Sequence, residues 1–217
     1  MELQSHDALL VIDMQRDFLP AIDGIGGALE VRDGDAIISG INALAQKFDH
    51  VILTQDWHPR GHISFASTHG KQPFSDTIEA PYGTQALWPD HCIQGSPGAE
   101  LHPALSIPHA ELLLRKGFRQ HIDSYSAFTE NDGVTPTGLA GYLRERGLTR
   151  LFFTGVAYDY CVGFSALAAA RLGFESIVVE DLTRGIAASS IDTTNTAFAD
   201  ARVQRIVVSD VAASDAR

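Results

Sequence analysis

The chain has 217 residues, of which 45% are hydrophobic and 20% charged, and its 16 basic and 27 acidic side chains give a formal net charge of −11. This composition is typical of a soluble globular protein, and the length suits one domain, which we expect to span residues 1–217. Nucleic acid and anionic membranes are excluded as expected partners, because both require the positive potential that this acidic chain lacks. Small-molecule chemistry is favoured instead.

Cysteine usage and the first residues together predict a cytoplasmic protein. Cys92 and Cys161 are too few for a disulfide framework, which indicates a reducing compartment. The N-terminal segment has no basic region, and its apolar run ends at Asp13. That run is well short of a signal-peptide core or of the roughly 20 apolar residues of a membrane span.

Short apolar runs alternate with segments of helical character along the chain. The expected strands cover residues 8–12, 51–54, 111–114, 151–154, 177–179 and 203–208. The expected helices cover residues 36–48, 139–146, 161–172 and 190–201. Most of the strand runs are continuously apolar, which suits strands buried on both faces of a parallel sheet. We therefore predict an α/β three-layer sandwich with a mostly parallel central sheet flanked by helices.

Two stretches interrupt this alternation, at residues 57–108 and 119–136. The first holds most of the histidines and prolines but no long helical or strand period. So long an irregular insert in a compact domain is usually functional, or else marks a wrong assignment of elements.

Reactive side chains follow four of the expected strands. Asp13 ends the first strand, Asp56 the second and Lys116 the third, while Cys161 follows the fourth at the start of an expected helix. Ligands of open parallel sheets bind beyond the carboxyl ends of the strands, so these side chains should converge. A helix N-terminus and a nearby ammonium would lower the pKa of the Cys161 thiol and make it nucleophilic.

Each of these residues also has a structural interpretation. Cys161 could be a packed apolar side chain, Asp13 could cap a turn or helix, and Lys116 could be a solvated strand end. Asp17 is better placed than Asp13 for capping. The four side chains together favour catalysis over packing.

A metal site is indicated by Asp56 and His58, which are two residues apart and point the same way in an extended segment. His62 and His91 lie further along the insert, and Cys92 could ligate a metal or simply pack. Two histidines and one carboxylate leave coordination positions open for water or substrate. A polar surface loop would produce similar spacings by chance, so the spacing alone leaves both interpretations open.

Several ordered motifs match a known family over nearly the whole chain. They are VIDMQRDF at 11–18, DWHP at 56–59 with His62, Ser64 and Phe65, LWPDHC at 87–92, RKG at 115–117, DSYSAF at 123–128 and GVAYDYCV at 155–162. By these motifs the chain resembles the bacterial nicotinamidases, also called pyrazinamidases, of the isochorismatase-like cysteine hydrolase superfamily.

The resemblance implies hydrolysis of nicotinamide to nicotinate and ammonia in NAD salvage, and of pyrazinamide as well. It makes Asp13 the general base, Lys116 the group that stabilises the thiolate, and Cys161 the nucleophile of a thioester intermediate. It also implies a cis peptide at Val156 and Ala157. The backbone N–H groups of Ala157 and Cys161 would then form an oxyanion hole.

The implied metal ligands are Asp56, His58 and His91, around an ion that holds the pyridine nitrogen and orients the substrate. Zinc is the expected ion, with iron and manganese as alternatives. Phe18 and Trp88 would flank the ring, although plain core packing is the alternative for both.

Two positions are left open by the resemblance, and so is the oligomeric state. His62 could be a further ligand, since family members differ there. Tyr158 stands where a small hydroxyl residue is expected, and it could narrow the site or point outward. The sequence leaves open whether the protein forms a homo-oligomer.

Other functions remain as alternatives. The chain could be a related amidase acting on another small amide, or a non-catalytic protein that binds metal or nicotinamide. A true isochorismatase would lack the nucleophilic Cys161, and a thiol redox protein would need a resolving cysteine near it.

Overall fold

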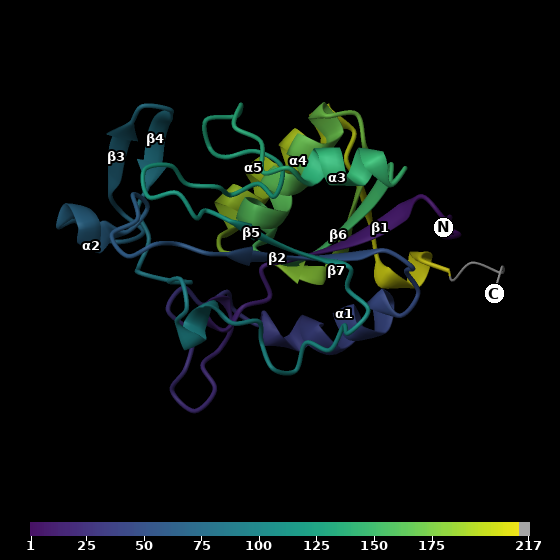
Figure 1. Ribbon diagram of the computed structural model, residues 1–217, viewed down its shortest axis with the longest axis horizontal. Helices are drawn as coiled ribbons and strands as arrows, with labels where there is room; N and C mark the ends of the chain where they lie inside the picture. Colours follow the sequence, from purple (N-terminus) through teal and green to yellow (C-terminus); the bar gives the residue numbers. More distant parts are fainter. Residues whose placement is uncertain (213–217) are drawn as a thin grey trace.

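The computed structural model describes residues 1–212 and is built on a six-stranded parallel sheet with the order β5-β2-β1-β6-β7-β8 (Figure 1). The strands are β1 (Asp7–Ile12), β2 (Val51–Asp56), β5 (Leu112–Lys116), β6 (Arg150–Val156), β7 (Glu175–Arg184) and β8 (Gln204–Ile206). All six predicted strands are confirmed. The expected run at 177–179 covers only part of β7, and β8 is shorter than the expected 203–208.

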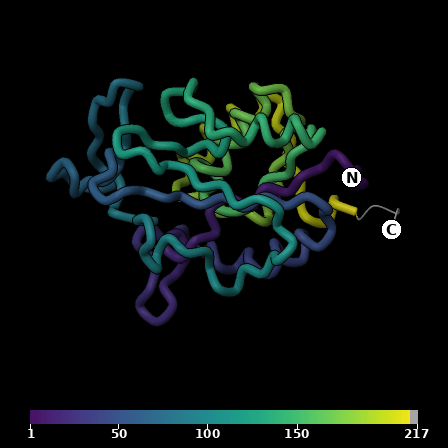
Figure 2. Tube along the Cα trace, in the orientation of Figure 1, coloured from purple at the N-terminus to yellow at the C-terminus, as the bar shows by residue number. Residues whose placement is uncertain are grey.

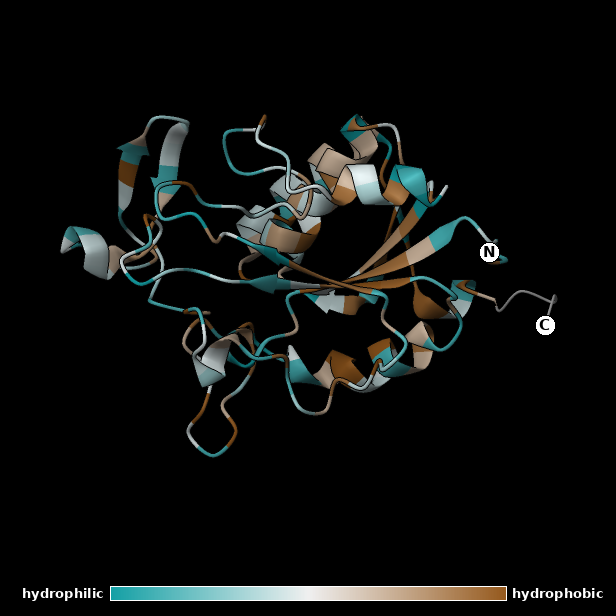
Figure 3. Cartoon of the chain, viewed as in Figure 1, coloured by the Kyte–Doolittle hydropathy of each residue, from teal (hydrophilic) through white to brown (hydrophobic). Residues whose placement is uncertain are grey.

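Helices cover both faces of this sheet, because alternate residues of its strands are apolar on both sides. Leu9 and Val11 of β1 pack in one hydrophobic cluster with α1 (Ile38–Ala45). Leu10 and Ile12 belong to a second cluster with α3 (Leu139–Glu145), α4 (Gly163–Arg171) and α5 (Ala188–Ala201). Figure 1 shows α1 below the sheet and the other three helices above it, and Figure 3 shows the hydrophobic strands between them. The predicted three-layer sandwich is confirmed.

The insert between β2 and β5 contains short elements that the sequence pattern did not reveal. They are α2 (Ala66–His69), the antiparallel hairpin of β3 (Thr77–Ala80) and β4 (Gly83–Ala86), and the 3-10 turn η3 (Pro97–Ala99). Figure 2 shows the hairpin at the end of the molecule opposite to both termini. The hairpin strands have four residues each and are partly exposed, so they show no continuous apolar run.

Single turns complete the chain. They are the 3-10 turns η1 (Arg16–Phe18), η2 (Asp35–Ile37) and η5 (Val208–Asp210), and the π-helical turn η4 (Tyr158–Val162) that leads into α4. Within the part of the chain that the structure describes, no helix is both long and apolar enough to cross a membrane.

The carboxyl ends of the central strands bring the reactive residues together. Asp56 and Lys116 are the last residues of β2 and β5 and are paired in register. Asp13 directly follows β1 with a left-handed φ of 47°, and the Val156–Ala157 peptide at the end of β6 is cis, as the resemblance implies. The parallel topology thus places all these chain segments at one edge of the sheet.

Gly155 sets how closely β6 approaches β1 beside this edge. Its φ is +102°, and a Cβ added there would lie 2.1 Å from the carbonyl oxygen of Ile12. We expect Gly155→Ala to lower the free energy of unfolding by about 2–4 kcal/mol, because it adds backbone strain to an overpacked contact. Denaturant unfolding followed by circular dichroism measures this change.

Gly141 offers a matched control on helix α3. A Cβ at Gly141 meets no heavy atom within 4 Å, so Gly141→Ala should raise the free energy of unfolding by roughly 0.5–1 kcal/mol through helix propensity. Similar effects of the two substitutions would contradict the role assigned to Gly155.

Candidate active site and metal centre

A buried ammonium group lies at the centre of the site. The Lys116 Nζ atom is 2.8 Å from Asp13 Oδ2 and 2.5 Å from Asp56 Oδ1. It also lies 3.3 Å from Cys161 Sγ and 3.0 Å from the carbonyl oxygen of Ser124. Asp13, Asp56 and Cys161 therefore meet around the Lys116 cation, the fourth of the residues that the sequence places beyond strand ends.

The charges of this cluster stabilise one another. Burial acts to lower the pKa of Lys116, but Asp13 and Asp56 together hold it well above its usual range. Burial acts to raise the pKa of Asp56, but Lys116 and His58 hold it well below its usual range. For Asp13 burial prevails over Lys116 and raises the carboxyl pKa. Asp13 is thus the more basic of the two carboxylates.

The environment of Cys161 favours the protonated form of its thiol. Burial raises the pKa of Cys161 well above its usual range; Lys116 lowers it, and Asp13 and Asp56 raise it further. The sequence predicts a lowered pKa for this thiol, and that prediction is wrong. Helix α4 begins at Gly163 rather than at the cysteine, and burial, reinforced by the two carboxylates, outweighs the ammonium.

A base must therefore accept the thiol proton before or during attack, and Asp13 is placed to do so. One carboxylate oxygen of Asp13 and the Sγ of Cys161 belong to a group of ligand atoms that all lie within 4.8 Å of one another. Asp13 Oδ1 accepts a hydrogen bond of 2.5 Å from the Thr54 hydroxyl, which fixes the carboxylate. The raised pKa of Asp13 favours its taking up a proton.

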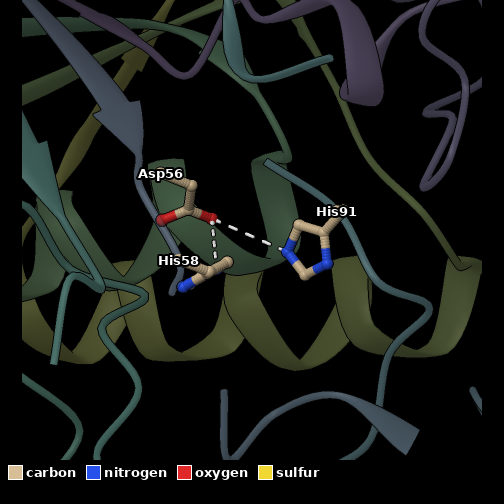
Figure 4. A group of neighbouring side chains, drawn as sticks. All are labelled: Asp56, His58 and His91. Atoms are coloured by element: carbon tan, nitrogen blue, oxygen red, sulfur yellow. Dashed lines mark ion pairs between the residues drawn. The ribbon is translucent and has the colours of Figure 1, made fainter. Parts of the chain in front are cut away.

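Asp56, His58 and His91 form a group suited to a divalent metal (Figure 4). Asp56 Oδ2 lies 3.5 Å from His58 Nε2 and 3.9 Å from His91 Nε2. Each histidine donates its Nδ1–H to a backbone carbonyl, His58 to Gly117 at 2.8 Å and His91 to Pro89 at 2.7 Å. These bonds fix the tautomer that leaves Nε2 free as a ligand, which is the usual arrangement around protein metal ions. The donor set therefore fits a metal.

His62 supports this group instead of extending it. Its ring stacks on His58 with centroids 4.1 Å apart. The Nδ1 atom accepts a hydrogen bond from the Ser64 hydroxyl at 2.7 Å, and Nε2 donates to the carbonyl oxygen of Ile122 at 3.2 Å. Both ring nitrogens have protein partners in this arrangement, and His62 also belongs to a second potential group of metal ligands, with His58 and Asp123.

An apolar cavity opens onto both Cys161 and the metal-ligand group. Phe18 and Trp88 line it, as the resemblance implies. Six further lining residues were not predicted as part of the site, and they are Leu29, Val31, Asp123, Tyr125, Tyr160 and Ile186.

Tyr125 and Tyr160 lie within the motifs at 123–128 and 155–162, and this position was the sequence signal that could have predicted them as part of the site. Trp88 donates its indole N–H to the Tyr125 hydroxyl at 3.0 Å, and its ring meets that of Tyr160 edge-on at 5.0 Å. A flat heteroaromatic ring suits such walls.

Two residues left open by the sequence lie outside the cavity lining. The Tyr158 hydroxyl is 2.5 Å from Asn195 Oδ1, and its ring packs against Phe198 of α5. Tyr158 therefore does not narrow the site. Cys92 is buried in the core, where its backbone N–H donates to Asp17 Oδ2 at 2.7 Å.

This arrangement defines the site of a cysteine hydrolase, with a cysteine, a carboxylate base and a lysine beside a potential metal centre at one edge of a parallel sheet. Residues 7–213 match the isochorismatase domain family. The chain therefore belongs to the isochorismatase family.

Three similar proteins carry nicotinamidase-related names or ligands. The chain is 52% identical over 187 residues to a nicotinamidase of Acinetobacter baylyi, covering 86% of this chain and 85% of the relative. The PnC1 protein of L. infantum, solved with nicotinate, superimposes with a TM-score of 0.85 at 40% identity and covers 98% of both chains. A pyrazinamidase of Pyrococcus horikoshii, solved with zinc, gives a TM-score of 0.75 at 32% identity over 93% of this chain and 99% of that one.

Replacing Lys116 by Met should shift the pH dependence of Cys161 alkylation to higher pH. The ammonium lowers the pKa of the thiol, so its removal leaves only burial and the carboxylates, which raise that pKa. The rate of iodoacetamide labelling against pH, with modified cysteine identified by mass spectrometry, measures the shift.

Lys47→Met serves as a matched control, since Lys47 donates to the carbonyl oxygen of Val211 away from the site. Its labelling profile should stay that of the unmodified protein. An unmoved profile for Lys116→Met in a folded protein would mean that the Lys116 charge does not affect the pKa of the Cys161 thiol.

Proposed function

We propose that this protein is a metal-dependent nicotinamidase, which hydrolyses nicotinamide to nicotinate and ammonia and acts on pyrazinamide as well. The observation that carries the proposal is the contact of Cys161 and Asp13 with one buried Lys116 at an aromatic cavity. The nicotinamidase of Acinetobacter baylyi and the nicotinate complex of the L. infantum protein support this substrate.

In the first half-reaction, Asp13 takes the proton of the Cys161 thiol while the sulfur attacks the amide carbon. The negative charge that develops on the carbonyl oxygen is held by the backbone N–H groups of Ala157 and Cys161. Asp13 then returns the proton to the amide nitrogen and the C–N bond breaks. Ammonia departs, and a thioester on Cys161 remains.

In the second half-reaction, Asp13 accepts a proton from water, and the resulting hydroxide attacks the thioester carbon. The C–S bond breaks, the sulfur regains its proton from Asp13, and the product leaves as nicotinic acid, which loses its carboxyl proton to water to become nicotinate. Lys116 keeps its charge throughout, because its two carboxylate partners hold its pKa well above the usual range. It stabilises negative charge on sulfur and on Asp13 alike.

Asp56, His58 and His91 would hold the metal ion, and Phe18 and Trp88 would hold the faces of the ring. A divalent ion bound there supplies a contact for the pyridine nitrogen and so orients the ring. We propose zinc, supported by the zinc complex of the P. horikoshii pyrazinamidase, while iron and manganese suit the same donors.

Two further features belong to this proposal. Residues 1–217 would act as one domain, since the reactive side chains come from β1, β2, β5 and the segment after β6. A cytoplasmic location is supported by two buried cysteines that are both free thiols.

Replacing Cys161 by Ala should abolish nearly all nicotinamide turnover, with a loss of at least about 10³-fold, while folding and zinc content stay unchanged. The reason is that no other group near the amide can form the thioester. Ammonia release and metal analysis of the purified variant measure both quantities.

Cys92→Ala is the matched control, because this buried thiol belongs to the hydrophobic core and is not among the residues that line the cavity. It should retain turnover within a few-fold. Substantial activity in Cys161→Ala would instead mean that water is delivered directly to the amide.

Benzamide separates orientation from activation by the metal. It keeps the amide and the flat ring but lacks the ring nitrogen, so it should be a much poorer substrate than nicotinamide. His91→Ala should lower kcat/KM for nicotinamide by at least about 10²-fold and change the slow benzamide reaction little. Equal losses for both substrates would show that the ion activates the carbonyl or water, or that the three ligands hold the fold together.

A further inference from the structure

Gln15 makes three hydrogen bonds from a fully buried side-chain amide, and two of them go to the backbone of Asp56. Its Oε1 accepts the Asp56 N–H at 2.8 Å, and its Nε2 donates to the Asp56 carbonyl oxygen at 2.8 Å. The second Nε2 proton is donated to the carbonyl oxygen of Ala99, also at 2.8 Å. Gln15 has 0% exposure, so no bond to water competes with these contacts.

This pattern of one donor and one acceptor is what a neighbouring strand would present to Asp56. The β1–β2 ladder pairs Val11 with Leu53, and β1 ends at Ile12. At Asp13 the chain turns with a φ of 47°, which takes the backbone out of the ladder while the carboxylate meets Lys116. Without a side chain in place of the β1 backbone, the N–H and carbonyl oxygen of Asp56 would have no hydrogen-bond partner on the β1 side.

On the opposite side, β5 continues to hold the same segment. Asp56 is in register with Lys116, and the Trp57 N–H donates to the carbonyl oxygen of Lys116 at 2.9 Å. With Gln15 on one side and β5 on the other, the main chain of Asp56 is held from both sides.

The position of that main chain decides where both carboxylate oxygens of Asp56 lie. Oδ1 lies against Lys116 at 2.5 Å, while Oδ2 faces His58 and His91 at 3.5 and 3.9 Å. A small rotation of the backbone would move one oxygen out of place, and metal affinity falls steeply when ligand geometry is lost.

We propose that Gln15 is a positioning residue for the metal centre, whose side-chain amide replaces the missing β1 backbone and fixes Asp56 as a ligand. This inference rests on the proposed metal-dependent function. Its readout is metal binding, so it can fail while nicotinamide hydrolysis is retained.

The experiment compares Gln15→Met with Gln55→Met. Gln55 is a second buried glutamine, next to Asp56 in sequence, and donates to the same Ala99 carbonyl oxygen at 3.1 Å, but neither Asp56 backbone group is among its partners. Zinc affinity is measured by competition with a chromophoric chelator, and thermal unfolding of the zinc-free proteins is recorded beside it. Gln15→Met should weaken zinc binding by about 10–100-fold. Gln55→Met should change it by less than about threefold.

A measurement on the unmodified protein covers the case in which Gln15→Met fails to fold. Binding is reciprocal, so if the Gln15 contacts favour zinc, saturating zinc must slow hydrogen exchange of the Gln15 side-chain amide. The Gln55 amide should change little. NMR of the side-chain amide protons with and without zinc measures both.

The inference would be overturned by unchanged zinc affinity in a folded Gln15→Met or by an equal loss of affinity in Gln55→Met. It would likewise be overturned if zinc did not change the exchange rate of the Gln15 side-chain amide. Failure of the unmodified protein to bind zinc would also overturn it. The proposed nicotinamidase activity is tested by a separate measurement, the release of ammonia.

Discussion

One buried ion cluster determines most of what this site can do. Lys116 carries its charge out of water only because Asp13 and Asp56 flank it, and neither carboxylate could remain ionised at this depth without the ammonium. Removing the ammonium would leave buried carboxylates without a cation, and breaking a buried ion pair in this way costs about 3–5 kcal/mol. Fold and chemistry are therefore linked, because the ion pairs tie β1, β2 and β5 together at the edge where the cavity opens.

Asp56 joins the two halves of the site through its two oxygens. Oδ1 belongs to the ammonium cluster and Oδ2 to the metal-ligand group, so the charge that holds Lys116 also supplies a ligand. The lowered pKa of Asp56 keeps it ionised for both tasks, whereas the raised pKa of Asp13 makes that residue the proton acceptor. Two aspartates at the ends of adjacent strands thus acquire different roles from their surroundings.

The sequence was sufficient for the sheet and for the residues at its edge, because continuous apolar runs and parallel topology are local or general properties. It was insufficient for the sign of the Cys161 pKa shift, which depends first on how deeply the sulfur is buried and then on which charges reach it. Tyr125 and Tyr160 were missed as cavity walls because a tyrosine in a motif does not show which way its ring points. The metal-ligand roles of Asp56, His58 and His91 came from the resemblance, since their spacing alone also suits a polar surface loop.

The protonated resting thiol has a consequence for how the reaction must begin. A thiolate formed in advance would place a third negative charge beside Asp13 and Asp56 in a buried position, where Lys116 favours the thiolate but burial and both carboxylates disfavour it. Proton transfer to Asp13 during attack avoids that state, because charge leaves sulfur as the new C–S bond forms and one carboxylate is neutralised in the same step. The negative charge then appears on the carbonyl oxygen, away from the carboxylates. An electrophilic carbon held against the sulfur is therefore part of what makes Cys161 acidic, and the walls that position the ring contribute to activating the nucleophile.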